Sequence, residues 1–441
     1  MRALVWLSVA CLVACGGGQS PGRTSPSQDA GGGGPDAGGA TKFTLKVQLS
    51  GKGTVLSSPQ GIDCGSGCGA SFETGTSVTL SATALSGEKF VGWSGACSGN
   101  GTCTVAMTAD ESVTASFAVP GSLYTIVELP PAEGVVSLRP TGVNAHGDVV
   151  GTYDVPPPQN QPPMHSFLYD AATRTTRRIS FDGSFEEAAT GINDNQQVSV
   201  SDNGMHFTGY RWQNGVLTDI GSLSSSDPES GGDAVNAQGW VAGWSTARDN
   251  VQHAVFWDGT LHDLGTLNGR LSIGLGLNAR GVVVGFASAG SGTNTHAAVF
   301  SGGTVRDLGT LGGAQSSALA INDNGRVVGW SLVGVPPNAA DVEHGFVHDL
   351  PNGPMRDIWP GQSTRLVAVN AAGDAVGSTL DITRGQNRAI VWRNGVVLDL
   401  TQALNDPSWV LLAATAINAS GQIAGFGVHG NEQHAFVLTP R

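Results

Sequence analysis

Residues 121 to 441 of this chain contain neither cysteine nor lysine. That absence excludes thiol nucleophiles, Schiff-base chemistry and a lysine-bearing phosphate loop from most of the protein. The same residues contain no Gly-x-Ser-x-Gly sequence, no His-Glu-x-x-His sequence and no glycine set of a dinucleotide-binding fold. We therefore predict no catalytic residue, no cofactor and no metal site, and we do not expect an enzyme.

Charged residues are scarce, at 13% of the 441 residues, and acids outnumber bases by 35 to 22. The resulting net charge of −13 opposes binding to nucleic acid and to anionic lipid, which leaves proteins, neutral glycans and small ligands as partners. Long amphipathic helices are absent beyond the first residues, whereas 65 glycines and alternating apolar residues are typical of strands and turns. The composition thus predicts an all-β fold.

The first 15 residues have the pattern of a signal peptide. A single Arg2 precedes an apolar run over 3–14 that is too short to span a bilayer, and Cys15 follows it. The sequence Leu-Val-Ala-Cys at 12–15 resembles the lipobox of bacterial lipoproteins, which implies that Cys15 becomes the lipidated first residue of the mature chain. Acyl chains would hold the protein at the outer membrane or cell surface, as its only membrane contact. An ordinary secretory leader is the alternative.

Residues 16–40 contain no aromatic residue and no large aliphatic residue, and they are rich in glycine, serine and proline. Such a segment cannot bury a core, so we predict a disordered linker. As a flexible coil it would reach roughly 25 to 30 Å, enough to hold a domain away from a membrane.

Residues 41–118 are predicted to form a separate small β domain, because apolar and polar residues alternate over 43–49, 77–83 and 112–117. Three of its segments, Gly-Thr-Val at 53–55, Phe-Val-Gly-Trp-Ser-Gly at 90–95 and Val-Thr-Ala-Ser-Phe at 113–117, resemble the divergent internalin-type B repeats of bacterial surface proteins. The resemblance implies a spacer or adhesion module.

Four of the six cysteines lie in this domain, at Cys64, Cys68, Cys97 and Cys103. Their spacings do not fit the closely paired thiolates of a zinc site, and a small exported domain gains stability from disulfides. We expect Cys64 to pair with Cys68 and Cys97 with Cys103, because each pair lies across a short glycine-containing loop. A crossed pairing is the alternative.

A repeated sequence organises the rest of the chain. It consists of a small residue, an aliphatic residue, an asparagine and, three positions later, a glycine in all copies but one. The seven asparagines are Asn144, Asn193, Asn236, Asn278, Asn322, Asn370 and Asn418. Their separations of 42 to 49 residues indicate a repeat architecture. Each copy is predicted to be a tight hairpin, and its small residue indicates an innermost strand, where backbones crowd.

A second motif follows each copy and adds two strands. It begins at His165, Thr208, His253, His296, His344, Arg388 and His434. Seven units of four strands predict a seven-bladed β-propeller over residues 121–441. The sequences His-Ala-Phe at 434–436, Asp-Leu-Gly-Thr-Leu at 263–267 and Ile-Asn-Asp-Asn-Gly at 321–325 resemble the extracellular HAF repeat family. That resemblance implies secretion and a propeller-like fold, and no known chemistry.

The repeats depart from this regular pattern in two respects: one copy lacks its glycines, and the last unit lacks a fourth strand. In the second copy Gln196 replaces the turn glycine and Val200 replaces a later glycine, so we expect a bulged unit. The last unit has no fourth strand of its own, whereas an extra fourth-strand sequence precedes the first unit. We predict that residues 123–129 form the outer strand of the unit made by 413–438 and so close the ring.

Histidines that open the third strands and acids of the fourth strands recur together. The acids are Glu128, Asp219, Asp263, Asp307, Asp357 and Asp399. Catalytic pairs or metal sites are conceivable, but one active site needs one constellation, so we prefer hydrogen bonds that join adjacent strands or blades. The Asn-Asp-Asn-Gly turn at 322–325 and the Asn-Asp-Asn turn at 193–195 lack the spaced acids of a calcium loop. Recurring aromatic residues are expected to pack between blades rather than to bind sugars: Trp244, Phe286, Trp330 and Phe426.

The links from second to third strands are long and differ between units, and alternating strand directions place them on the face opposite the asparagine turns. Function concentrates on variable loops of a rigid scaffold. The candidate binding residues on this face are Tyr153, Asp154, His206, Arg248, Asp249, Asp341, Glu343, Asp381, Arg384, His429 and Glu432. We predict a cell-surface lipoprotein whose propeller binds an extracellular protein or glycan. A propeller-based polysaccharide hydrolase or lyase is the alternative.

Overall fold

The computed structural model describes residues 41–441 except 65–67, 86–87, 119–122, 136, 155–164, 180–186, 203–206, 268–270, 290–293, 335–341, 382–383 and 405. The expected signal peptide with Cys15 and the linker over 16–40 lie outside the described residues. Within the described part the chain forms nine β-sheets, of which residues 42–118 supply two. The other seven sheets have four strands each, so the fold is all-β, as predicted.

The amino-terminal module combines a sheet of order β3-β1-β7-β5 with a sheet of order β2-β4-β6. Its strands are β1 (Lys42–Ser50), β2 (Gly53–Ser58), β3 (Gly69–Glu73), β4 (Ser77–Ala84), β5 (Lys89–Gly95), β6 (Cys103–Ala106) and β7 (Glu111–Ala118). Strands β1 and β7 pair in parallel, and the other paired strands are antiparallel. Residues from both sheets share one apolar core.

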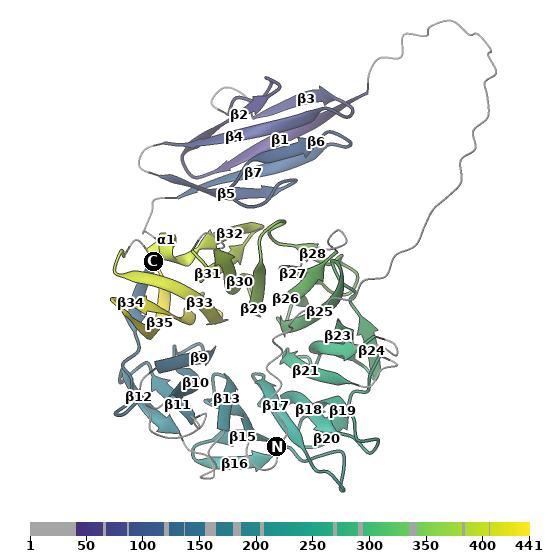
Figure 1. Ribbon diagram of the computed structural model, residues 1–441, viewed down its shortest axis with the longest axis vertical. Coiled ribbons are helices and arrows are strands. Elements are labelled where there is room, and N and C mark those ends of the chain that lie inside the picture. The colour runs from purple at the N-terminus through teal and green to yellow at the C-terminus, as the bar shows by residue number, and fades with distance from the viewer. Residues whose placement is uncertain are drawn as a thin grey trace, which may run out of the picture. The chain divides into compact units, whose positions relative to one another are not determined.

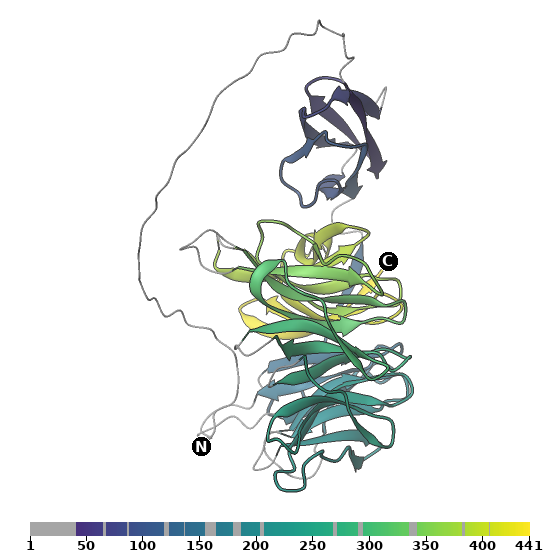
Figure 2. The same cartoon turned by 90° about the vertical axis from the view of Figure 1, so that its right-hand side faces the viewer.

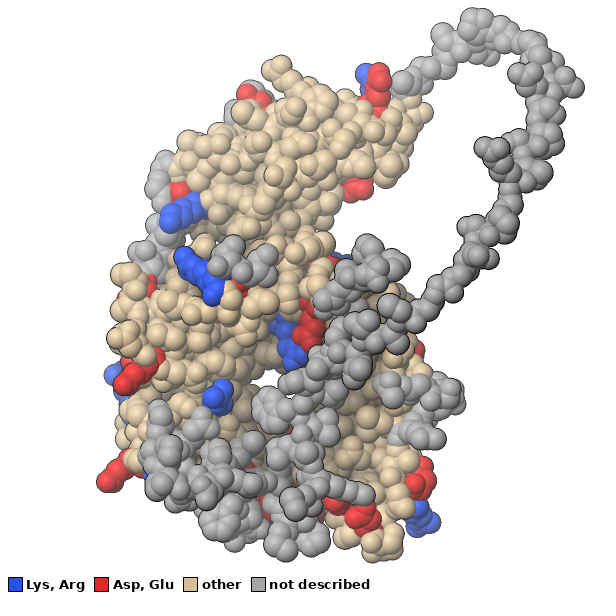
Figure 3. Space-filling model, in the orientation of Figure 1, with Lys and Arg blue, Asp and Glu red and all other residues tan. Residues whose placement is uncertain are grey.

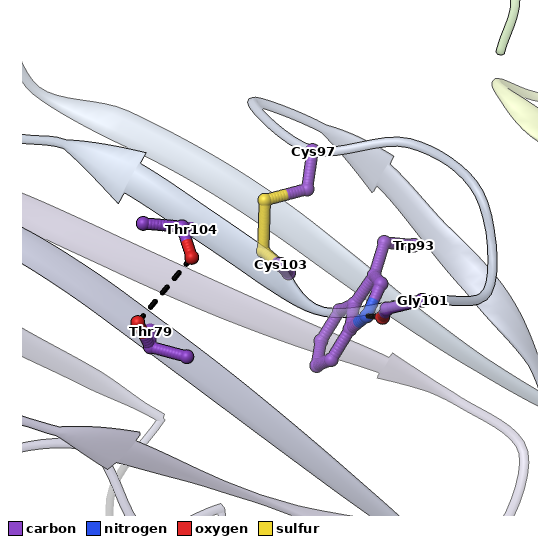
Figure 4. The surroundings of a disulfide bond; sticks show 6 residues. All are labelled: Thr79, Trp93, Cys97, Gly101, Cys103 and Thr104. Atoms are coloured by element: carbon purple, nitrogen blue, oxygen red, sulfur yellow. Dashed lines mark hydrogen bonds between the residues drawn. A yellow bond between two sulfur atoms is a disulfide. The ribbon is translucent and has the colours of Figure 1, made fainter. Parts of the chain in front are cut away.

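Both predicted disulfides are present in this module. Cys64 is joined to Cys68 and Cys97 to Cys103, with Cα–Cα distances of 4.5 and 5.6 Å. Beside the second bridge the indole nitrogen of the buried Trp93 donates a hydrogen bond of 2.9 Å to a backbone carbonyl of the same loop (Figure 4). The disulfide and the tryptophan therefore hold the loop between β5 and β6 from both sides.

The seven four-stranded sheets follow one another along residues 124–440, and we call each a blade. Blade 1 is β9 (Ser137–Val143), β10 (Val149–Asp154), β11 (His165–Asp170) and β12 (Thr175–Ile179). Blade 2 is β13 (Glu187–Ile192), β14 (Val198–Asp202), β15 (Thr208–Gln213) and β16 (Val216–Asp219). Blade 3 is β17 (Ser230–Val235), β18 (Val241–Thr246), β19 (Gln252–Trp257) and β20 (Leu261–Asp263). Blade 4 is β21 (Ser272–Leu277), β22 (Val283–Ser288), β23 (Thr295–Ser301) and β24 (Thr304–Asp307).

Blades 5 to 7 continue the same order of antiparallel strands. Blade 5 is β25 (Gly312–Ile321), β26 (Arg326–Val333), β27 (Glu343–Asp349) and β28 (Arg356–Asp357). Blade 6 is β29 (Thr364–Val369), β30 (Ala375–Asp381), β31 (Gln386–Arg393) and β32 (Val396–Asp399). Blade 7 is β33 (Trp409–Ile417), β34 (Ile423–His429), β35 (Glu432–Pro440) and β8 (Tyr124–Glu128), and the short helix α1 (Leu400–Leu404) precedes it.

The first strands of the blades surround the centre of the ring (Figure 1), and the view turned by 90° shows the blades edge-on (Figure 2). Each first strand contacts the first strand of the next blade, and β33 of blade 7 contacts β9 of blade 1. The contacts therefore run around a closed circle, which makes the fold a β-propeller. We call the space that the seven first strands enclose the lumen.

The asparagine of each repeat builds the hairpin between first and second strands. In blade 5 the side-chain oxygen of Asn322 accepts hydrogen bonds of 3.1 and 2.9 Å from the backbone amides of Asn324 and Arg326. Gly325 completes the turn with a φ of 85°, in the left-handed region that glycine adopts without strain. The predicted hairpin is thus confirmed, and asparagine is needed because its short side chain can satisfy two amides of its own turn.

The same asparagines also join the blades. The side-chain amide of each donates to the backbone carbonyl of the asparagine in the next blade, at 2.8 to 3.4 Å, and Asn418 donates to Asn144 at 2.8 Å. All seven are nearly buried. These bonds form a circle on one face of the propeller, which we call the asparagine ring.

Every first strand carries a β-bulge at one equivalent position, three residues before the asparagine. The bulged residues are Thr141, Thr190, Asp233, Leu275, Leu319, Val367 and Thr415. The second blade is therefore bulged, as expected, but every other blade is bulged at the same position. Gln196 adopts the turn conformation of its glycine counterparts, with a φ of 54°.

The small residue after each bulge packs against the neighbouring blade. A Cβ atom built on Gly276 would lie 2.9 Å from the Cα atom of Ala320, and one on Gly142 would lie 3.2 Å from the Cα atom of Gly191. A larger side chain would separate the first strands, which confirms the predicted crowding of backbones.

The chain closes the ring with its own beginning. Strand β8 pairs antiparallel with β35, in a register that places Glu128 opposite Phe436 and Thr125 opposite Thr439. Tyr124 and Leu129 at its ends are buried in the apolar clusters of blade 7 and of its contact with blade 1. The predicted closure by residues 123–129 is confirmed. No helix in the described part of the chain is long and apolar enough to cross a membrane.

Candidate functional site

The two faces of the propeller differ in how regular they are. One face carries the asparagine ring, in which seven copies of a motif make the same bonds. The other face, which we call the loop face, carries the links from second to third strands. In each pair of these strands the described candidate residues lie at the end of the second strand, in the link, or at the start of the third.

Not all of the predicted binding residues can be placed. His206 and Asp341 lie outside the described residues, as does the side chain of Asp154. Arg248 and Asp249 lie in the short link between β18 and β19, and Arg384 lies in the link between β30 and β31. These links belong to blades 3 and 6, and the other described candidates lie in blades 1, 5, 6 and 7, so the structure distributes the candidates around the loop face.

Most described candidates are held in ion pairs within the propeller. Glu343 pairs with Arg365 through two nitrogens, with the shortest contact 2.7 Å. Asp381 accepts a bond of 3.0 Å from Arg388. Glu432 is largely exposed and lies 4.0 Å from the ring of His434. The loop face therefore has rigid, mostly paired charges that differ from blade to blade.

The recurring histidine and acid residues do form pairs, and these join the third and fourth strands of one blade. The Nδ1 atoms of His253, His296 and His344 lie 2.9, 2.8 and 2.6 Å from the carboxylates of Asp263, Asp307 and Asp357 respectively. In blade 6 Arg388 replaces the histidine and contacts Asp399 at 2.6 Å. The repetition at equivalent places confirms the interpretation as a bond between adjacent strands.

The acid of each pair has a second contact that explains its position. Another contact of Asp263 is a hydrogen bond of 2.8 Å from the backbone amide of Gly265, and Asp307 and Asp357 bind the amides two residues later at 2.6 and 2.9 Å. The aspartate thus ends the fourth strand in an Asx turn and also orients the histidine. Both roles are structural.

Blade 1 lacks such a pair because Arg178 occupies the place of the acid. His165 instead stacks on Tyr153, with ring centroids 5.1 Å apart, and Arg178 lies 5.6 Å from the Tyr153 ring. Burial raises the pKa of Tyr153, and the pKa of His165 is lowered by burial and by the Arg178 charge. Tyr153 is buried and packs between strands, so little of its surface is left for contact with a ligand.

Blade 7 has the most developed cluster of candidate residues. The two carboxylate oxygens of Glu128 lie 2.8 Å from the Nδ1 atoms of His429 and His434. The His429 ring stacks on the buried Trp409 at 4.6 Å and 5°. Because Glu128 belongs to β8, this cluster attaches the closing strand to the rest of the blade. Sequence reasoning named both histidines and Glu128 separately and missed Trp409, which lies outside the repeated motifs.

The Asn-Asp-Asn turns use their acids for bonds between blades. Asp194 accepts a bond of 2.7 Å from the amide of Ala145, and Asp323 accepts one of 2.7 Å from the amide of Ala279. Each acid therefore binds the asparagine turn of the preceding blade, in the place where calcium was considered. Among the described residues no group of three or more histidines, cysteines and acids is arranged to hold a metal ion.

Three of the four recurring aromatic residues pack across blade boundaries. Arg139 of blade 1 lies 5.9 Å from the ring of Phe426 in blade 7, and Arg365 of blade 6 lies 5.1 Å from the ring of Trp330 in blade 5. Trp244 is 5.9 Å from the Phe207 ring. The expected packing between blades is confirmed for these three, and each remains half-buried.

Sequence reasoning missed a hydroxyl group that also joins the blades, which we call the hydroxyl latch. The oxygen of Ser316 accepts a bond of 2.8 Å from the amide of Ala297 in the preceding blade, and its proton goes to the carbonyl of Gly309 at 2.6 Å. The latch residues are Ser230, Ser272, Ser316 and Thr364. All four stand six residues before the repeat asparagine, which is the signal that could have revealed them.

One bulged residue differs from the others in its chemistry. Asp233 is half-buried in the first strand of blade 3, and its Oδ2 atom is shielded and has no hydrogen-bond partner. Burial raises its pKa to about 7. An unpaired carboxyl in such a place is costly, and perturbed carboxyl groups of this kind often belong to functional sites.

A model of the divergent InlB B-repeat domain matches residues 43–120, which confirms the resemblance of the amino-terminal module. No curated protein matches the chain.

Two solved structures are similar in fold to part of this chain. The β-propeller domain of the Trilobed protease from Pyrococcus furiosus, described as having an open velcro topology, is 8% identical and covers 70% of this chain and 98% of its own, with a TM-score of 0.43. YCF48 bound to D1 peptide is 11% identical and covers 71% and 94%, with a TM-score of 0.41. No function is transferred from either.

Proposed function

We propose that this chain is a bacterial surface lipoprotein, lipidated at Cys15, whose seven-bladed propeller of HAF-type repeats is a scaffold that binds an extracellular protein or glycan. The observation that carries the proposal is the contrast between the two faces. Bonds of the asparagine ring repeat from blade to blade, whereas the ion pairs of the loop face change. A rigid disc with one variable face is the usual design of a binding propeller.

The charges on the view in Figure 3 support a specific rather than a purely electrostatic contact. Basic and acidic side chains are scattered singly over the uncovered part of this view and form no continuous patch of either sign. A partner recognised here would be selected by shape and hydrogen bonds, since screening at physiological salt weakens isolated exposed charges.

A glycan array and a pull-down from extracellular material, both with residues 121–441, test the proposal. We expect retention of a defined ligand that is lost when exposed loop-face residues such as Asp249 and Glu432 are both changed to alanine. A matched change on the opposite face, Asp323→Ala, is the control and is expected to keep the ligand if the variant is folded. Absence of any retained glycan or protein would contradict the proposal.

The alternative of a polysaccharide hydrolase or lyase has less support. Glycosidase chemistry requires two free carboxyl groups facing each other across a cleft. Among the carboxylates that share a partner on the described loop face, Asp381 and Asp399 are both bound by Arg388, at 3.0 and 2.6 Å. Asp249 and Asp263 likewise both contact His253, at 3.7 and 2.9 Å. Assays of reducing ends and of unsaturated products on a polysaccharide panel distinguish the two functions.

The lipid anchor is tested separately. Mass spectrometry of the mature amino terminus is expected to find an acylated Cys15. An unmodified terminus elsewhere in residues 12–40 would contradict the anchor and would leave the binding function untouched.

A further inference from the structure

The lumen of the propeller is lined by the seven bulged residues of the first strands. All seven are half-buried, whereas in blade 4 the residues on either side of Leu275 are buried. Because adjacent first strands are in contact all around the circle, a side chain exposed at the middle of these strands is exposed to the lumen. A hollow at the centre of the ring is visible in Figure 3.

The lining divides into a polar arc and an apolar arc. Blades 7, 1, 2 and 3 contribute the polar residues, which are Thr415, Thr141, Thr190 and Asp233. Blades 4, 5 and 6 contribute the apolar residues, which are Leu275, Leu319 and Val367. The seven equivalent positions of the lumen therefore form one continuous polar arc and one continuous apolar arc.

The polar arc offers hydrogen-bond acceptors. The hydroxyl of Thr141 donates to the carbonyl of Ala189 at 2.7 Å, and that of Thr190 donates to the carbonyl of Gly232 at 2.8 Å. Since a hydroxyl has one proton and two lone pairs, each threonine oxygen keeps acceptor capacity, although the Thr190 oxygen also lies 2.8 Å from the hydroxyl of Ser199. Asp233 adds a half-buried carboxyl group whose Oδ2 atom is shielded and has no partner. This half of the lumen therefore suits a ligand that donates hydrogen bonds or carries positive charge.

The apolar arc is available for contact with the remainder of such a ligand. Leu275, Leu319 and Val367 take part in none of the apolar clusters that the described residues form between blades 4, 5 and 6. They are half-buried aliphatic side chains on one wall of the lumen. Burying a butyl-sized stem against them would favour binding, because it removes apolar surface from water.

We propose that the lumen binds an organic cation, a primary ammonium or guanidinium group on a short apolar stem, with the cation at Asp233 and the stem against Leu275, Leu319 and Val367. The pairing would give the unpartnered carboxylate its counter-charge, and a mostly apolar site with few polar groups is the usual form of a small-ligand site. The site lies inside the ring, so it stands or falls independently of partner binding on the loop face.

Titration calorimetry of the full chain at pH 8 tests the proposal with n-butylammonium and butylguanidinium as probes. We expect one molecule bound per chain, and at least tenfold weaker binding of 1-butanol, which has the same stem without the charge. Asp233→Asn is expected to weaken the binding of both cations at least tenfold, and Leu319→Ser to weaken it severalfold. Unequal stoichiometry, or butanol bound as well as the cations, would overturn the proposal.

Two controls keep the result interpretable. Asp249→Asn removes an exposed acid of the loop face, 60% exposed in its side chain, and is expected to leave the affinity unchanged. The fold of Asp233→Asn is checked by its melting curve, and we expect this variant to melt no lower than the parent because it loses an unpaired buried acid. Retained cation binding in a folded Asp233→Asn protein, or no binding of either probe to the parent, would refute the site.

Discussion

Each asparagine of the ring combines two tasks in one side chain. The Asn278 oxygen accepts bonds of 3.0 Å from the amides of Arg280 and Val282, while its nitrogen donates to the carbonyl of Asn322 at 3.3 Å. The first two bonds shape the hairpin and the third joins neighbouring blades. No other side chain of similar length offers both a double acceptor and a donor in this geometry, since aspartate lacks the donor.

Asn278→Ala is therefore expected to lower the free energy of unfolding by about 2 to 4 kcal/mol, because two buried amides and one carbonyl lose their partners. Chemical denaturation measures the change. The control is Asn352→Ala, at an exposed turn position, which is expected to change stability by less than about 0.5 kcal/mol. A loss below about 1 kcal/mol for Asn278→Ala would contradict the role of the ring.

Gln196 shows why one repeat could dispense with glycine. Its positive φ of 54° is strained for a side chain of this type, yet its amide donates a bond of 2.8 Å to Asp148 of the preceding blade. The strain in the turn is offset by an additional bond between blades.

Two substitutions at this position separate the two effects. Gln196→Ala keeps the strain and loses the bond, so we expect destabilisation of about 1 to 2 kcal/mol. Gln196→Gly loses the bond but relieves roughly 1 kcal/mol of strain, so its stability is expected to be close to that of the parent. If thermal or chemical denaturation finds the alanine variant as stable as the glycine variant, the conformational strain is absent.

Asp233 predicts a pH dependence of stability. Its pKa in the folded protein is raised by burial from 3.8 to about 7, so between about pH 4 and pH 7 the unfolded chain releases a proton that the folded chain retains. The contribution of this group is therefore favourable only at low pH, and stability falls as pH rises through that window.

Asp233→Asn removes this penalty. We expect the variant to exceed the parent by up to about 4 kcal/mol at pH 8, an upper limit from the size of the shift, and to approach it near pH 4. Melting curves at pH 4, 6 and 8 measure the difference. A difference that is constant across these pH values would show that the carboxyl of Asp233 titrates normally.

At the scale of the elements, the latch explains how consecutive blades keep their spacing on the loop-face side. The third strand of one blade would otherwise leave a buried amide without a partner, because its first residues extend beyond the pairing with the fourth strand. The latch hydroxyl, on the first strand of the following blade, accepts the hydrogen bond of this amide. It also donates a hydrogen bond to a carbonyl of the link between the two blades.

Ser316→Ala leaves the amide of Ala297 and the carbonyl of Gly309 unpaired, so a loss of about 1 to 3 kcal/mol is expected. Hydrogen exchange should also become faster at the Ala297 amide. Ser301→Ala, at an exposed position of β23, is the matched control and should affect neither measurement. Unchanged exchange at Ala297 in the Ser316→Ala protein would mean that the latch does not hold the amide.

Local signals in the sequence were sufficient to predict the hairpins. The asparagine, the positive-φ glycine and the small residue each act within one repeat or against the identical next repeat, so seven copies reveal them together. The sequence predicts a bulge in the second unit alone and does not predict the latch, because the partner of each lies in another strand whose register is unknown from the sequence. The burial of Tyr153 could not be predicted for a similar reason, since it depends on Arg178 and His165 of two further strands.

The candidate site was predicted less completely than the fold. Repetition identified the histidine and acid residues as structural, and the structure agrees. Repetition cannot identify a position where the copies differ, and Asp233 is such a position among threonines and aliphatic residues. Its place in the lumen follows only from the folded ring, in which the seven bulged residues occupy equivalent positions.

At the scale of the whole molecule, the propeller is closed by two independent sets of contacts. The side-chain amide of Asn418 donates to the carbonyl of Asn144 in the asparagine ring, and β8 completes blade 7 as its outer strand. The sequence separation of these contacts is close to the length of the domain, so their formation costs chain entropy that the interblade packing must offset. The burial of Tyr124, Leu129 and Phe436 in apolar clusters offsets part of this entropy cost.

The closing strand also protects an edge. Without β8, the strand β35 would expose the backbone groups of residues 436–440 that now pair with it, and such a free edge is a template for association with other chains. Closure and solubility are therefore expected to depend on the same segment.

The measurement that tests this closure most directly compares residues 121–441 with residues 131–441 by calorimetry and by sedimentation. Removal of residues 121–130 is expected to lower the melting temperature of the whole propeller in one cooperative transition and to produce oligomers through the free edge of β35. Removal of everything before residue 119 is expected to leave the propeller's melting temperature unchanged. An unchanged melting temperature and a monomeric state for residues 131–441 would contradict the closure by β8 and the seven-bladed ring that depends on it.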